Sequence, residues 1–180
     1  DAPVFLYIGR VLWDKGIGEF VERARKLKET HPGAQCQIAG KVDVDNVTAI
    51  GKSQVIKWEN EGVIEYLGFH HDPRGFIEDA DCVVLPSYRE GLPRSLLEGA
   101  AMGRPLLASD CPGCTDVVMD GVNGFVFRTK NSESLLSAMR RFIKLSFSER
   151  QQIGAAGRKI VEDRFDQSLV HEAYLKVTTG

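Results

Sequence analysis

The apolar residues of this chain fall into two alternating patterns. Short runs rich in Val, Ile and Leu are separated by longer stretches in which apolar residues recur at helical spacing. Short continuous runs predict strands buried on both faces, and their alternation with helices is typical of a parallel sheet. We predict six strands, at Val4–Ile8, Cys36–Ala39, Ile64–Leu67, Cys82–Leu85, Leu106–Ser109 and Phe125–Phe127.

The stretches between these runs predict helices with recognisable ends. His31-Pro32-Gly33 stops the first helix, and Gly103-Arg104-Pro105 stops the fourth. The predicted helices are Ile17–Thr30, Val44–Glu61, Arg74–Glu78, Arg94–Met102, Thr115–Met119, Ser132–Leu145, Ser148–Asp163 and Gln167–Val177. The pattern therefore predicts an α/β fold, a doubly wound parallel sheet of about six strands with helices on both faces and a helical C-terminus. Such sheets bind ligands at the carboxyl ends of their strands.

Composition narrows the class of protein without identifying it. The chain has 180 residues, 43% of them hydrophobic and 27% charged, which suits one globular domain over residues 1–180. The formal net charge of −2 excludes a globally basic nucleic-acid or membrane binder. No apolar run approaches the roughly 20 residues that span a bilayer, and no signal peptide precedes Val4. Because the chain starts without Met, almost within a strand, we expect a piece of a longer protein.

The four cysteines are too few for a disulfide scaffold. Cys36 and Cys82 lie in apolar runs, where a reduced thiol behaves as a small hydrophobe, so we expect a cytoplasmic protein. Cys111-Pro112-Gly113-Cys114 precedes a predicted helix, where a Cys-x-x-Cys pair can be a redox dithiol. A thioredoxin-like chain would place this pair after an early strand, so a dithiol oxidoreductase is an alternative and not the leading hypothesis.

The segment from Glu90 to Glu98 indicates a ligand site. Its two carboxylates bracket a Gly-Leu-Pro turn that opens a short helix. Pro93 suits the first helical position, so the next amides stay free to bind an anion. Helical side chains lean toward the N-terminus, so Glu98 should reach back over the same helix end.

The apolar residues of that helix make it look buried, and a buried glutamate needs a polar partner. The residues concerned are Leu96, Leu97, Ala100 and Ala101. The alternative is a chance pair of glutamates, one on a loop and one salt-bridged to a neighbouring Lys or Arg.

A glycine-rich loop with two cations follows the first strand. Counting from Gly16 and Gly18, the third glycine of a dinucleotide fingerprint would fall at Val21, and Lys15 does not fit a Walker loop. What remains is Arg10 and Lys15 above the sheet. A guanidinium fork and a mobile ammonium together suit a diphosphate, whereas the alternative is two solvated loop cations.

The loops after the second and third strands carry weaker signals. After the second strand come Lys41 and an Asp43-Val44-Asp45 triplet. Asp43 or Asp45 could hold a metal, but we favour an N-cap of the following helix. After the third strand, Phe69, His70 and His71 lack the further ligands of a zinc site, so we interpret them as a wall of the cavity.

Five motifs in a fixed order carry a family resemblance over nearly the whole chain. They are Gly9-Arg10-(x)4-Lys15-Gly16, Leu85-Pro86-Ser87, the stretch from Glu90 to Asp110, Asp120-Gly121-Val122-Asn123-Gly124-Phe125, and Glu162-Asp163-Arg164-Phe165. With them the chain resembles the C-terminal, donor-binding domain of a retaining GT-B glycosyltransferase of family 4 (glycosyl transferases group 1). The resemblance implies a Rossmann-like domain that is one half of a GT-B fold.

The resemblance also implies roles for individual residues. It gives catalytic roles to Arg10 and Lys15, which would hold the donor diphosphate, and to Glu90, which would lie against the donor sugar. Glu98 would hydrogen-bond the ribose hydroxyls. The implied substrate-binding residues are Gly9, Gly91, Leu92, Pro93, Ser95, Leu96 and Glu98, with amides around residues 91–93 lining the sugar site and those of Ser95 and Leu96 meeting phosphate.

The function implied by the resemblance is transfer of a hexose from a nucleotide-diphosphate sugar, with UDP-hexose as the expected donor. The acceptor, a glycan or lipid-linked glycan, would bind an N-terminal domain absent from this chain, so the isolated piece should bind donor without turnover. Membrane contact would come only through that missing half, and no metal, other cofactor or nucleic acid is expected.

One motif departs from the family pattern. Many members carry Gly-Gly-x-Pro-Glu where this chain has Pro112-Gly113-Cys114-Thr115-Asp116. This form is similar to that of bacterial enzymes of capsular or lipid-linked glycan synthesis. Asp116 takes the place of the usual Glu, which leaves its role open. A non-catalytic, flavodoxin-like interaction domain remains the other alternative.

Overall fold

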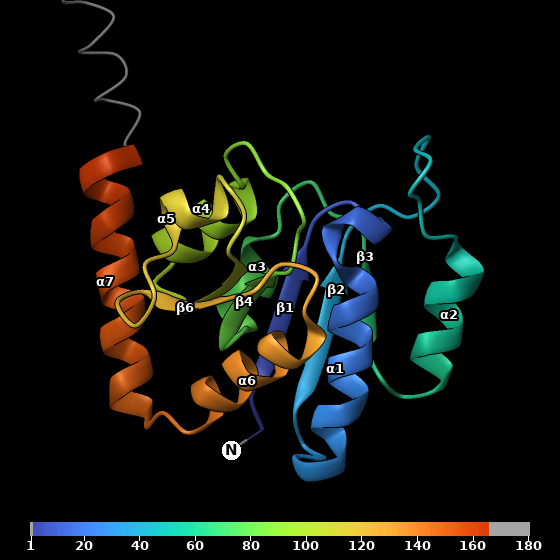
Figure 1. Cartoon of the computed structure of the whole chain (residues 1–180), viewed down its shortest axis with the longest axis horizontal. Coiled ribbons are helices and arrows are strands. Elements are labelled where there is room, and N and C mark those ends of the chain that lie inside the picture. Colours follow the sequence, from blue (N-terminus) through green and yellow to red (C-terminus); the bar gives the residue numbers. More distant parts are fainter. Residues whose placement is uncertain (1, 166–180) are drawn as a thin grey trace, which may run out of the picture.

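The computed structural model describes residues 2–165, and its six strands form one parallel sheet (Figure 1). The strands are β1 (Val4–Ile8), β2 (Gln35–Ala39), β3 (Glu65–Gly68), β4 (Cys82–Leu85), β5 (Leu106–Ser109) and β6 (Gly124–Phe127). They lie in the order β3-β2-β1-β4-β5-β6. The first strand, β1, lies in the middle of the sheet, and the later strands are added outward on both of its sides. The predicted Rossmann-like, doubly wound α/β fold is therefore confirmed.

Helices cover both faces of this sheet. They are α1 (Ile17–Thr30), α2 (Lys52–Asn60), α3 (Arg74–Asp79), α4 (Arg94–Ala101), α5 (Cys114–Val117), α6 (Ser132–Ile143) and α7 (Phe147–Phe165). On one face α1 packs against α6, and on the other α4 contacts α3, α5 and α7 (Figure 1). The helix predicted at Gln167–Val177 lies outside the described residues.

The central strands are buried, as their apolar runs predict. Every residue of β4 and β5 is buried, and so are Phe5, Leu6 and Tyr7 of β1. The ring of Phe5 meets that of Phe142 edge to face, with 5.5 Å between the centroids. Burying a side chain of this size contributes roughly 1.5–3 kcal/mol, so the sheet is a firm platform for the loops that leave it.

The winding reverses between β1 and β4. The two strands pair at Phe5–Cys82 and Leu6–Val83, and the Val4 amide donates to Asp81 Oδ2 at 2.8 Å. Their crossovers leave in opposite directions, which places the loops after β1 and β4 beside each other at one edge of the sheet. Sequence positions about 80 residues apart therefore meet where a ligand site is expected.

The helix predicted at Val44–Glu61 is wrong over its first half. Residues 43–51 form a loop that pairs with the segment after β1: Trp13 donates to Thr48 O, and Ile50 donates to Val11 O. The β-branched residues of this stretch favour extended backbone, and long-range pairing supplies the hydrogen bonds that a helix would have made. Asp43 is not the N-cap residue of α2, although its Oδ1 accepts the Lys52 amide at 3.1 Å.

Other differences concern the ends of elements. β3 begins at Glu65 and not Ile64, α5 spans Cys114–Val117 instead of Thr115–Met119, and a 3₁₀ turn at Trp13–Lys15 was not predicted. Predicted ends are uncertain by a residue or two because terminal turns have weak local signals.

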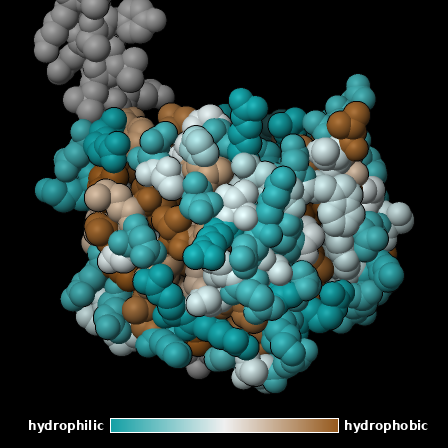
Figure 2. All heavy atoms as spheres, viewed as in Figure 1, coloured by the Kyte–Doolittle hydropathy of each residue, from teal (hydrophilic) through white to brown (hydrophobic). Residues whose placement is uncertain are grey.

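The face shown in Figure 2 is largely hydrophilic, and its hydrophobic spheres gather where α4, α5 and β6 lie beside α7. Among the exposed large apolar side chains, Met119 and Val122 belong to the turn that follows α5. Within residues 2–165, no helix has the length and hydropathy needed to cross a membrane.

Candidate functional site

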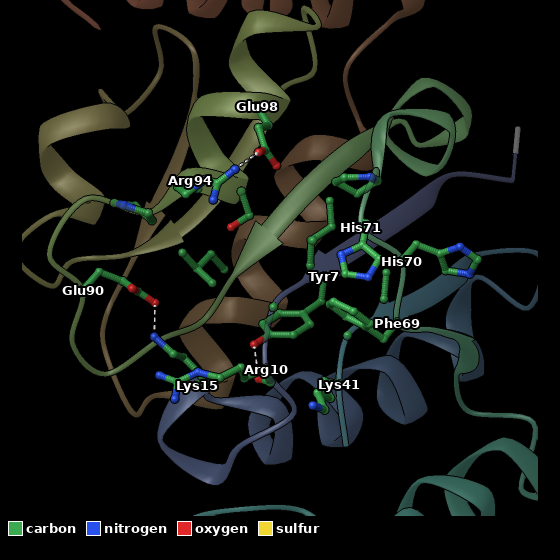
Figure 3. A pocket seen from close by; sticks show the side chains of 18 of the residues that line it. Tyr7, Arg10, Lys15, Lys41, Phe69, His70, His71, Glu90, Arg94 and Glu98 are labelled. Atoms are coloured by element: carbon green, nitrogen blue, oxygen red, sulfur yellow. Dashed lines mark hydrogen bonds and ion pairs between the residues drawn. The ribbon is translucent and has the colours of Figure 1, made fainter. Parts of the chain in front are cut away.

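A cavity of about 500 Å³ opens at the carboxyl ends of β1 to β4, beside the start of α4 (Figure 3). Of the ten site residues predicted from the sequence, eight line it: Gly9, Arg10, Lys15, Glu90, Leu92, Pro93, Ser95 and Glu98. Gly91 and Leu96 do not line it. The structure thus brings together residues from both sides of the reversal point.

Lys15 and Glu90, which both line the cavity, form an ion pair. Lys15 Nζ lies 2.6 Å from Glu90 Oε1, and the two side chains are only 16% and 14% exposed (Figure 3). Lys15 ends the 3₁₀ turn, which Gly16 closes at φ 71°. A Cβ on Gly16 would lie 2.0 Å from Pro86 O, so only glycine lets the loop after β1 approach the loop after β4 this closely.

The backbone of Arg10 is fixed by a hydrogen bond, whereas its side chain is exposed to solvent. The Tyr7 hydroxyl donates to Arg10 O at 2.8 Å (Figure 3), and burial raises the pKa of Tyr7, which keeps this donor protonated. The Arg10 guanidinium makes no hydrogen bond or ion pair with other described residues. It is therefore a cation at the cavity wall that an anionic ligand can approach.

The start of α4 also presents donors to the cavity. Pro93 is the N-cap residue, with ψ 105°, and not the first helical residue as predicted. Its carbonyl accepts from both Leu96 and Leu97 at 3.2 Å. The amides of Arg94 and Ser95 find no acceptor within residues 2–165, so these two, at a positive helix end, can bind an anion. Leu96 is buried and its amide is already used, so its phosphate contact stays a prediction.

Glu98 lies one turn into α4 and lines the cavity, but it is not deeply buried. Its side chain is 35% exposed, and Arg94 Nη2 lies 3.4 Å from Glu98 Oε1 (Figure 3). The expectation of a wholly buried helix is wrong for Leu97, which is half-buried, and for Ala101, which is exposed. An ion pair this long and exposed is weak, so the carboxylate can exchange partners.

Both glutamates are therefore salt-bridged, as the alternative interpretation of this segment expected of one of them. They nevertheless line the same cavity, one at each end of the turn that opens α4. Ion pairing and a ligand site are thus compatible at this segment.

The loop after β3 forms a wall of the cavity, as predicted. Phe69, His70 and His71 line it, and the rings of Phe69 and His71 meet edge to face at 5.0 Å (Figure 3). The cavity is also lined by residues that were not among the predicted site residues, and Tyr7 and Lys41 are the polar-tipped aromatic and the cation that these include. A polar-tipped aromatic near the end of β1 and the first cation after β2 were the signals that could have identified them.

The cysteine pair does not have the features of a redox dithiol. Cys111 and Cys114 are buried, and burial raises the pKa of Cys114, whereas a reactive thiol needs a lowered pKa and access to solvent. Asp116 is exposed and does not line the cavity.

The chain thus has a Rossmann-like sheet with cations and a helix end at its reversal point, and these are the features with which such folds bind phosphate groups. Residues 1–160 match the model of the family described as Glycosyl transferases group 1, and the chain belongs to this family. The family predicted from the motifs is confirmed.

Two relatives to which the chain is similar are named as glycosyltransferases, in agreement with the family match. The chain is 31% identical to an N,N'-diacetylbacillosaminyl-diphospho-undecaprenol alpha-1,3-N-acetylgalactosaminyltransferase of Campylobacter jejuni, over 97% of this chain and 44% of the relative. It is 25% identical to the capsular polysaccharide biosynthesis glycosyltransferase CapM of Staphylococcus aureus, over 96% of this chain and 44% of the relative. The chain thus spans less than half the length of these relatives.

Solved structures share the fold. Anabaena Alr3699/HepE in complex with UDP gives a TM-score of 0.86 at 20% identity, over 99% of this chain and 49% of that one. The C-terminal domain of the glycosyl transferase group 1 family protein LpcC of Francisella tularensis gives a TM-score of 0.75 at 22% identity, over 92% of this chain and 88% of that one. The fold is that of the C-terminal half of a GT-B enzyme.

Proposed function

We propose that this chain is the donor-binding half of a retaining glycosyltransferase and that it binds a nucleotide-diphosphate sugar, with UDP-hexose as the donor. The observation that carries the proposal is the convergence in one cavity of two cations, a helix end with free amides and a carboxylate. Each group matches one part of such a donor.

The diphosphate would lie between the loop after β1 and the start of α4. Arg10 offers a guanidinium fork, Lys15 a point charge, and Arg94 and Ser95 their amides. Together they would offset the charge that develops on the leaving diphosphate, so we propose that no metal is required.

The two carboxylates would take the sugars of the donor. Glu98 would accept hydrogen bonds from the ribose hydroxyls, because its present partner is weakly held at 3.4 Å. A diphosphate beside Lys15 would compete with Glu90 for the ammonium, which leaves the Glu90 carboxylate free to face the hexose.

The acceptor would bind a further domain of the longer protein. The Campylobacter relative is named for a lipid-linked acceptor and the Staphylococcus relative for capsular polysaccharide. We propose a bacterial pathway of that kind, at the cytoplasmic face of the membrane, with membrane contact through the missing half. The isolated chain would bind donor without transferring the sugar.

A panel of nucleotides tests this proposal. In buffer with EDTA, UDP at 100 times its dissociation constant should stabilise the chain by about 2.7 kcal/mol, which raises the melting temperature. Uridine should do less because it lacks the diphosphate. Loss of the UDP effect in EDTA would contradict the metal-free site.

The panel also separates the alternatives. No response to any nucleoside diphosphate would overturn the proposal in favour of an interaction domain. Insulin reduction that is lost in Cys111→Ser would favour an oxidoreductase.

A further inference from the structure

The turn at residues 111–114 touches the binding loop without reaching the cavity. Gly113 is buried at φ 82°, directly behind the turn that carries Glu90. A Cβ on Gly113 would lie 2.1 Å from Gly91 O and 2.8 Å from Glu90 O. These atoms belong to the backbone and cannot rotate away, so the contact exists only because this position is glycine.

Two serines near this contact, Ser109 at the end of β5 and Ser87 after β4, also hold the loop after β4. The buried Ser109 hydroxyl donates to Ser87 O, and the Ser87 hydroxyl donates to Arg89 O at 3.1 Å. Both serine side chains are inaccessible to solvent, so these hydrogen bonds are shielded from competing water. The last residue of β5 and the turn that follows this strand thus hold the loop after β4 at two points, one on each side of Arg89.

We propose that Gly113 and Ser109 are positioning residues, which set the diphosphate site by fixing the turn from Glu90 to Pro93. The inference rests on the proposed function of that site. It also gives the Cys-Pro-Gly-Cys motif a role: Cys111 and Cys114 are its buried anchors, and Gly113 is its point of contact.

The turn controls both halves of the diphosphate site. At one end Glu90 holds the Lys15 ammonium at 2.6 Å, and at the other Pro93 starts α4 and its free amides. Glu98 lies further along α4, which is anchored by the buried Leu96 and Ala100. A displaced turn therefore disturbs phosphate contacts while the ribose contact stays in place.

The test compares Gly113→Ala with Gly121→Ala. Gly121 also has a positive φ, 75°, but open space where a Cβ would go, so Gly121→Ala carries a backbone penalty without the contact. Gly113→Ala should weaken UDP binding about 10-fold, which is about the effect of losing one hydrogen bond to a charged group. Uridine affinity should change less than about twofold in both variants, and UDP affinity should be unchanged in Gly121→Ala.

A loss of uridine and UDP affinity in equal proportion would mean general destabilisation and overturn the inference. So would equal UDP affinities for Gly113→Ala and Gly121→Ala. In the Glu90→Gln background, the Gly113→Ala effect on UDP binding should shrink, because part of it acts through Glu90.

Ser109→Ala provides a variant that keeps the glycine contact and should fold. We expect a UDP loss of about threefold with uridine unchanged. In the ligand-free protein, Ser109→Ala and folded Gly113→Ala should both shift the amide NMR signals of Glu90, Gly91 and Leu92, and Gly121→Ala should not.

This ligand-free measurement separates the two proposals. Unshifted amide signals in Ser109→Ala would overturn the positioning role whatever nucleotide binds. If the amide signals shift in Ser109→Ala but the protein does not bind UDP, only the proposed function would be contradicted.

Discussion

The wall made by the loops after β1 and β4 is held by contacts between distant parts of the chain, whereas the loop after β3 is held by its own neighbours. In the first wall, Lys15 pairs with Glu90 and Gly16 packs on Pro86. In the loop after β3, the ring contacts and the ion pair within residues 2–165 join residues at most six positions apart: Phe69 with His71, His70 with Phe76, and Asp72 with Arg74.

The difference teaches where this cavity is preorganised. In the function that we propose, the cross-linked wall would bind the diphosphate of the donor, so little ordering would be needed when it binds. The loop after β3 is exposed, with Phe69 53% accessible, and can adapt to the less constant part of a ligand. Four predictions test this comparison.

The largest effect should separate two glycines, Gly16 in the first wall and Gly68 at the end of β3, where the loop of the second wall begins. Gly16 and Gly68 have φ 71° and 76°, but a Cβ meets Pro86 O at 2.0 Å from Gly16 and nothing within 4 Å from Gly68. Gly16→Ala should lower the free energy of unfolding by about 2–4 kcal/mol, and Gly68→Ala by about 1 kcal/mol. Urea unfolding measures both, and equal losses would remove the distinction between the walls.

Removing a cation from the first wall should have the next largest effect. Lys15→Ala or Arg10→Ala should weaken UDP binding by about 1.4–3 kcal/mol, which is about 10- to 100-fold. Arg74→Ala is the matched control because Arg74 is exposed and does not line the cavity. Calorimetry that finds the same affinity in all three variants would refute the diphosphate assignment.

A smaller, selective effect is expected at Glu98. Glu98→Gln should weaken UDP binding by about 1 kcal/mol, because a charged acceptor for the ribose hydroxyls becomes a neutral amide. Binding of 2′-deoxy-UDP should fall less. If titration shows both nucleotides losing affinity alike, the carboxylate does not contact the ribose.

The smallest effect should come from the loop after β3. His71 is exposed, and its ring contact within residues 2–165 is with Phe69, so His71→Ala should change the free energy of unfolding by less than about 0.5 kcal/mol. Its effect on UDP affinity should be below that of Lys15→Ala. A thermal melt and one titration check both, and a loss as large as that of Lys15→Ala would contradict an adaptable second wall.

The sheet and most of the site could be predicted from the sequence because their signals are local. Each apolar run of three to five residues predicts its own strand, the runs of β4 and β5 also predict their burial, and a turn before α4 predicts a helix end. The loop at residues 43–51 could not be predicted, since its backbone partners lie around Val11 and Trp13, more than 30 positions earlier. Long-range pairing overrides local propensity there.

The same reasoning applies within the site. The presence of Arg10, Lys15 and Glu98 at one cavity followed from the rule for parallel sheets. The Lys15–Glu90 pair did not, because it depends on how closely two loops approach. That approach is set by Gly16 against Pro86, a contact that spacing along the chain does not reveal.

The pairing of β1 with β4 has a consequence for how the protein folds. Arg10 and Lys15 follow β1, whereas Glu90 and α4 follow β4. Neither half of the chain therefore holds a complete site. The junction joins Val4 to Asp81 across 77 positions, and closures of that length are slow compared with helix formation. Nucleotide affinity should accordingly be among the last properties to emerge during refolding, after helical circular dichroism has recovered.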